Sequence, residues 1–131
     1  MKLQYLTQKD LLGASFSYNY KNARERYNGF IGRSYQLSYK RSLPLNQNLS
    51  LSFSSTTNDY HQADAIYLST VEREDIIHST SLGFGGPIGE SDWTYNINLN
   101  WNNTESNIIN YTTSGETVGF SLTKQFSLSD L

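Results

Sequence analysis

The chain has 131 residues, a formal net charge of −2 and no cysteine, and 37% of its residues are hydrophobic, 17% charged and 14% aromatic. This length fits one domain, and the missing cysteines exclude disulfides and thiolate metal sites. A net charge of −2 does not indicate nucleic-acid binding, and the aromatic content argues against disorder.

No run of about 20 apolar residues exists that could form a transmembrane helix. Residues 1–10 lack the apolar core of a signal peptide, so we expect any export signal upstream or absent.

Apolar and polar residues alternate along six segments, which predict six β-strands in chain order: 12–20, 34–42, 48–56, 74–84, 93–103 and 116–126. The clearest alternation is Trp93-Thr94-Tyr95-Asn96-Ile97-Asn98-Leu99-Asn100-Trp101-Asn102, in which every second residue is Thr or Asn. Successive side chains of a strand point to opposite faces, so each strand has one apolar and one polar face. The chain is therefore predicted to be all-β, a single domain over 1–131 with a short tail at 127–131.

The predicted connections alternate in length. Short turns are expected at 43–47 and 85–92, whereas 21–33, 57–74 and 104–115 look longer and hold most of the charge. An up-and-down antiparallel meander gives this alternation, and outer-membrane β-barrels show it as short periplasmic turns and longer extracellular loops.

Two architectures explain the alternation: a transmembrane β-barrel and a soluble β-sandwich. Three features favour the barrel. The polar face is Ser, Asn, Thr, Gln and Gly with almost no charge, and aromatic residues gather near strand ends, as in membrane girdles. The third is length, because nine tilted residues at 118–126 reach roughly 23 Å, close to an apolar band of about 25 Å.

This interpretation assigns a role to each face of the strands. The expected lipid-facing residues are Phe16, Leu37, Leu51, Phe53, Ile97, Leu99, Phe120 and Leu122. The expected lumen-facing residues are Ser50, Ser52, Asn96, Asn98, Asn100, Ser121 and Thr123.

The end of the chain carries the most specific motif. Val118-Gly119-Phe120-Ser121-Leu122-Thr123-Lys124-Gln125-Phe126 resembles the C-terminal strand of bacterial outer-membrane β-barrels, which alternates apolar residues and ends on Phe. The resemblance implies that Val118, Phe120, Leu122 and Phe126 form the signal read by the barrel-assembly machinery. Lys124 and the residues after Phe126 depart from the family pattern.

Two shorter motifs give a narrower resemblance. Ser106-Asn107-Ile108-Ile109-Asn110-Tyr111 and Arg73-Glu74-Asp75 look like the end of the surface lipoprotein assembly modifier barrel and of related tetratricopeptide-plus-barrel exporters. The resemblance implies export of a client, a lipoprotein or a polysaccharide, across the outer membrane.

The strand count predicts a fragment. Single-chain barrels begin at about 8 strands, so six strands are expected to be the C-terminal part of a larger barrel or of a truncated gene. A seventh strand at 65–71 is the alternative.

No residue pattern predicts catalysis. His61 and His78 have no metal-ligand spacing, His78 and Ser79 would point to opposite faces, and 83–87 lacks the features of a phosphate loop. The run 72–75 is best explained as a solvated loop. We expect no enzyme activity, metal or cofactor.

The sequence therefore predicts a pore or translocation barrel in a bacterial outer membrane, with membrane lipid, the assembly machinery and an exported client as partners. The alternative is a soluble β-rich module that binds carbohydrate through Trp93, Trp101 and the asparagines at 96, 98, 100 and 102.

Overall fold

The computed structural model describes residues 1–23, 28–63 and 71–126, and these residues are almost entirely β-structure. The strands are β1 (Lys2–Leu6), β2 (Asp10–Lys21), β3 (Phe30–Ser42), β4 (Asn48–Ala63), β5 (Glu72–Pro87), β6 (Trp93–Ser106) and β7 (Thr113–Lys124). Two single 3-10 turns, η2 (Pro44–Asn46) and η4 (Ile109–Tyr111), lie in the connections. No helix in this part of the chain is long and apolar enough to cross a bilayer.

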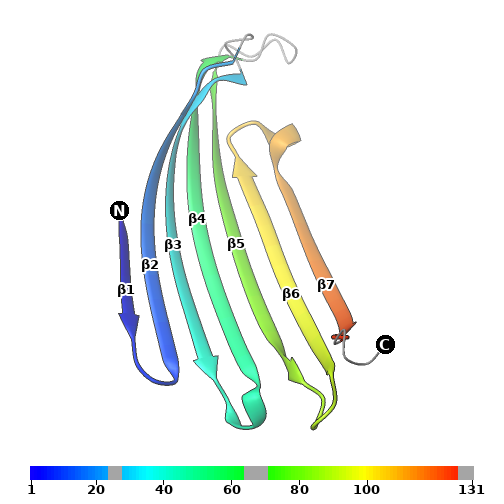
Figure 1. The fold of residues 1–131 in the computed structure, drawn as a ribbon. Helices are drawn as coiled ribbons and strands as arrows, with labels where there is room; N and C mark the ends of the chain where they lie inside the picture. Colours follow the sequence, from blue (N-terminus) through cyan, green and yellow to red (C-terminus); the bar gives the residue numbers. More distant parts are fainter. Residues whose placement is uncertain (24–27, 64–70, 127–131) are drawn as a thin grey trace.

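Each strand pairs antiparallel with the next strand in the sequence, giving one seven-stranded curved sheet in the order β1 to β7 (Figure 1). The predicted all-β, antiparallel, up-and-down arrangement is therefore confirmed. The sheet is not closed, because among the described residues β1 pairs only with β2 and β7 only with β6.

The pairing register sorts the side chains into an apolar and a polar face. One row across the sheet joins Leu12, Tyr39, Leu51, Leu82, Leu99 and Val118. The next row along the strands joins Gly13, Ser38, Ser52, Ser81, Asn100 and Thr117. Because neighbouring rows point to opposite faces, the alternation read in each strand becomes a property of the whole sheet. The sheet is a single layer, and no hydrophobic side chain among the described residues is buried.

The prediction of six strands was wrong, because a seventh strand, β1, precedes the others. Leu3 and Tyr5 of β1 alternate with Lys2 and Gln4, but five residues ending on Leu6 give too short a pattern to be recognised. Pairing of Leu3 with Ala14 and of Tyr5 with Leu12 continues the apolar row onto β1. The alternative strand at 65–71 falls largely on residues 64–70, outside the described part of the chain, as does the predicted tail at 127–131.

The long connections are shorter than predicted, because strands extend into all three of them. β4 continues to Ala63, β5 begins at Glu72, and β3 begins at Phe30. In the extensions of β4 and β5 both faces are largely polar, so the alternation disappears there, yet backbone pairing persists through pairs such as Arg33 with Thr57. The predicted turn at 85–92 is also shorter, because β5 continues to Pro87.

The length alternation itself remains. The connections at 7–9, 43–47 and 88–92 have three, five and five residues, whereas those at 22–29, 64–71 and 107–112 have eight, eight and six. The three shorter connections lie at the same end of the strands, at the bottom of Figure 1, which we call the short-turn edge; the opposite end is the long-connection edge.

The last strand ends earlier than predicted. β7 covers Thr113–Lys124, so Phe126 lies two residues beyond its end. The Nζ atom of Lys124 lies 4.9 Å from the Phe126 ring centroid, and the Gln125 amide donates to the Asp92 carbonyl oxygen at 3.0 Å. The C-terminal motif is therefore a strand followed by a residue held near the β5–β6 turn.

Candidate functional site

The first candidate surface is a belt of uncharged side chains on the apolar face, which we call the apolar belt. On β3, Tyr39, Leu37 and Tyr35 lie between Arg41 and Arg33. On β7, Leu122, Phe120 and Val118 lie between Lys124 and Glu116. In both strands the flanking charges are eight residues apart, which is about 26 Å along the strand and about 20 Å across a membrane at a 40° tilt.

Most side chains of the apolar belt are exposed, although the belt is rich in hydrophobic residues. All eight residues predicted to face lipid lie on this face, and the exposed fraction reaches 57% for Leu37 and 68% for Phe120. Leu99 is the only one of these eight that is partly buried. An exposed apolar surface of this extent indicates an interaction with lipid or with another protein.

Aromatic residues at the short-turn edge of the belt have polar partners. The Tyr39 hydroxyl donates to Asp10 Oδ1 at 2.7 Å, and the Tyr95 hydroxyl donates to Gln47 Oε1 at 2.6 Å. Each ring thus lies on the apolar face with its hydroxyl at the charged or turn residues of the edge. Such placement suits an interface between an apolar phase and water.

The second candidate surface is the opposite face of the sheet, which we call the polar wall. All seven residues predicted to face a lumen lie on it: Ser50, Ser52, Asn96, Asn98, Asn100, Ser121 and Thr123. Hydroxyl and amide groups both donate and accept hydrogen bonds, so this surface can hydrate well without fixed charge.

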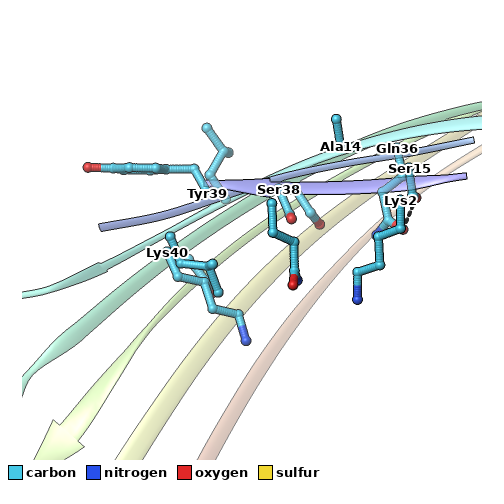
Figure 2. A pocket seen from close by; sticks show the side chains of 13 residues that line it. Lys2, Ala14, Ser15, Gln36, Ser38, Tyr39 and Lys40 are labelled. Carbon is cyan, nitrogen blue, oxygen red and sulfur yellow. Dashed lines mark hydrogen bonds between the residues drawn. The ribbon is translucent and has the colours of Figure 1, made fainter. Parts of the chain in front are cut away.

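A pocket of about 410 Å³ lies on the β1–β4 part of the polar wall. Figure 2 shows Lys2 and Lys40 extending from the same side of the sheet, while Ala14 points to the other side. Side chains with hydrogen-bonding groups surround them, including Ser15, Gln36 and Ser38. Sequence reasoning missed this pocket because it depends on residues from four strands.

The third feature is a charged cluster near the long-connection edge, on the polar side. Arg73 Nε donates to both carboxylate oxygens of Asp75, at 3.0 and 2.9 Å, and Arg73 Nη2 donates to the Tyr60 hydroxyl at 2.6 Å. The guanidinium carbon lies 4.0 Å from the Tyr60 ring centroid and 3.6 Å from that of Tyr111. Asp75 is only 2% exposed. The cluster therefore joins β4, β5 and the β6–β7 connection.

Protonation in this cluster follows from burial and charge. Burial raises the pKa of the Tyr60 hydroxyl, although the charge of Arg73 opposes this shift. Burial acts to lower the pKa of Arg73, but the hydrogen bond to Asp75 and the nearby charges raise it overall. Tyr60 is thus neutral and Arg73 cationic at neutral pH.

Asn107 fixes the same connection to β5. Its Oδ1 atom accepts from the Glu74 amide at 2.9 Å, and its Nδ2 atom donates to the Glu72 carbonyl oxygen at 2.9 Å. The prediction of a solvated loop at 72–75 was therefore wrong, since these residues form the start of β5. The Arg-x-Asp spacing places both side chains on one face of a strand, a signal that was available in the sequence.

Among the described residues, neither histidine belongs to a cluster that could act in catalysis or bind a metal ion. His78 is on the apolar face with its ring centroid 6.1 Å from that of Phe53, whereas Ser79 belongs to the polar wall. The ring centroid of His61 lies 5.4 Å from that of Tyr20. Within 1–23, 28–63 and 71–126, no three His, Cys, Asp or Glu side chains lie close enough to hold a metal ion.

Comparisons with protein-family models, with curated proteins and with solved structures find no match to this chain.

Proposed function

We propose that this chain forms part of the wall of a transmembrane β-barrel in a bacterial outer membrane. The apolar belt would contact lipid, and the polar wall would face a water-filled lumen. The observation that carries the proposal is the belt itself, an exposed apolar surface bounded on the same face by charges at both strand ends, such as Arg41 and Arg33 on β3.

The single-layer architecture supports lipid as the partner of this face. A soluble β-sandwich buries its apolar face against a second sheet, and the described residues form one sheet with no second layer. The belt also has the dimension of a thin bilayer core, about 20 Å against an apolar band of about 25 Å. In water such a face would lead to association between molecules.

Within this proposal, the chain acts as a pore or as a translocation barrel. The polar wall offers neutral hydroxyl and amide groups that hydrogen-bond a hydrated client weakly and repeatedly, which suits passage better than capture. The resemblance of β7 to the terminal strand of outer-membrane barrels supports recognition by the barrel-assembly machinery. The resemblance of 106–111 and 73–75 to lipoprotein and polysaccharide exporters supports one of those clients.

Closure of the barrel requires further strands. In a seven-stranded meander β1 and β7 run in the same direction, so joining them edge to edge would make a parallel pair. Bacterial barrels close with antiparallel pairs and even strand numbers of eight or more. An odd number of additional strands, from a longer chain or from another chain, would satisfy both conditions.

Cysteine scanning along β6 tests the proposal cleanly, because the chain has no native cysteine. A fluorophore attached to a single cysteine at 97, 99 or 101 should be quenched by nitroxides on lipid chains. The unlabelled cysteines at these positions should resist water-soluble thiol reagents in the folded protein. Single cysteines at 96, 98 and 100 should show the opposite behaviour. The matched pairs share one strand, so differences in local folding cannot produce the alternation.

The competing function, a soluble carbohydrate-binding module, predicts a different result. A fluorophore attached to its cysteine at 97, 99 or 101 would not be quenched by lipid nitroxides, and the protein would stay monodisperse without detergent. That pair of results would refute the membrane proposal.

A further inference from the structure

Apart from one ion pair, the charges on the described part of the polar wall are all positive. In the described strands this face carries Lys2, Lys21, Lys40, Arg73 and Asp75. Arg73 and Asp75 neutralise each other in the charged cluster. The remaining charges are three ammonium groups, none of which forms an ion pair with another described residue.

Two of these lysines lie along the proposed membrane-spanning part of the sheet, Lys2 at mid-belt depth and Lys40 at the short-turn rim of the apolar belt. Lys40 is between Tyr39 and Arg41 in sequence and points to the other face, and Lys2 pairs with Ser15, between Ala14 and Phe16. A lysine at the depth of Lys2 would be costly against lipid. Its placement on the polar wall fits a face that is in contact with water.

The pocket around these two lysines is chemically suited to anions. Its lining includes Lys2, Lys40, Gln4, Gln36 and several serines, and it contains no carboxylate. Ammonium, amide and hydroxyl groups all donate hydrogen bonds, and anionic oxygens accept them. The opposite face carries charges of both signs, with Arg33, Arg41 and Lys124 beside acidic residues such as Asp59, Glu105 and Glu116.

We infer that the lumen formed with this sheet conducts anions in preference to cations, and that Lys2 and Lys40 produce this preference. The inference rests on the proposed function. Fixed positive charges in a narrow aqueous path raise the local concentration of anions, which is how basic side chains select anions in pores. A client that carries phosphate, sulfate or carboxylate groups fits the same surface.

The test is the reversal potential of the complete protein in a planar bilayer under a KCl gradient. The wild-type permeability ratio of chloride to potassium should exceed one and should fall toward one in the Lys2→Gln/Lys40→Gln variant. The preference should weaken as KCl rises from about 0.1 M to about 1 M, because the screening length falls from about 10 Å to about 3 Å.

Two control variants separate charge from structure. Arg41→Gln/Lys124→Gln removes the same charge from the apolar face and should leave the ratio at the wild-type value. Lys2→Arg/Lys40→Arg keeps the charge and should retain the anion preference.

The outcomes are distinct. A conducting wild-type pore without anion preference would overturn the inference and leave the proposed function standing. A ratio unchanged in Lys2→Gln/Lys40→Gln would do the same. A folded, membrane-inserted protein without conductance would overturn both the inference and the open water-filled lumen of the proposed function, and would leave only the contact with lipid.

Discussion

Arg73 and Asp75, two residues apart on β5, form a two-pronged ion pair in which the carboxylate is almost completely buried. The tyrosines at 60 and 111 enclose the guanidinium, so the pair is both an electrostatic contact and a packing unit. It lies beyond the apolar belt, where the strands extend past the proposed membrane. It holds the β6–β7 connection against β5 and so orders one of the longer connections.

This arrangement predicts a large difference between two carboxylate substitutions. Asp75→Asn should destabilise the protein by about 1.5–3 kcal/mol, because Arg73 loses charge-assisted hydrogen bonds in a buried site. Asp59→Asn removes the partner of Arg33 at 3.1 Å, but that pair is exposed and should cost about 0–1 kcal/mol. Urea unfolding in detergent measures both free energies. Equal losses would contradict the structural role of the buried pair.

The face assignment on β6 predicts a second contrast, between neighbouring residues. Leu99 is central in the apolar belt, so Leu99→Arg should cost about 2–4 kcal/mol in a bilayer. Asn98→Arg places the same charge on the polar wall and should fold with nearly wild-type yield. Folding yield into liposomes is the measurement. Similar yields for the two variants would argue against lipid on the Leu99 face.

Two glycines on the polar wall should respond differently to the same added methyl group. A Cβ atom at Gly85 would lie 2.6 Å from the Tyr95 carbonyl oxygen, a backbone atom of the paired strand. Gly85→Ala should therefore cost about 1–3 kcal/mol. At Gly119 the nearest atom would be 3.9 Å away, so Gly119→Ala should be neutral or stabilise by up to about 1 kcal/mol. Unfolding free energies that do not differ would show that β5 and β6 separate easily at this point.

The open edges of the sheet predict the behaviour of these 131 residues refolded by themselves. Both β1 and β7 present unpaired backbone groups, which lipid cannot satisfy. We expect edge-to-edge assemblies rather than a closed monomer. Gel mobility before and after boiling, combined with light scattering in detergent, distinguishes these states. A monodisperse monomer that migrates faster before boiling would mean that seven strands can close.

The sequence by itself determined the strand class, the antiparallel meander and the face of each residue in the belt. Alternation is a local property, so Leu99 and Asn98 could be assigned to opposite faces without knowledge of any partner strand. The same reasoning failed where the pattern was short, as in β1, or where both faces were polar, as in the extensions of β4 and β5. In those segments backbone hydrogen bonds to the neighbouring strands maintain the strand. Such pairing cannot be recognised from the amino-acid composition of one strand.

Only the tertiary structure decided which distant residues meet. The register placed Lys2 beside Ser15 and brought Lys40 to the same pocket, and it placed Tyr60 and Tyr111 against Arg73. These contacts depend on the alignment of strands separated by tens of residues, and on the two-residue period that keeps each side chain on its face. The apolar belt could therefore be predicted from the sequence, whereas the lysine pocket and the two tyrosines that enclose Arg73 could not.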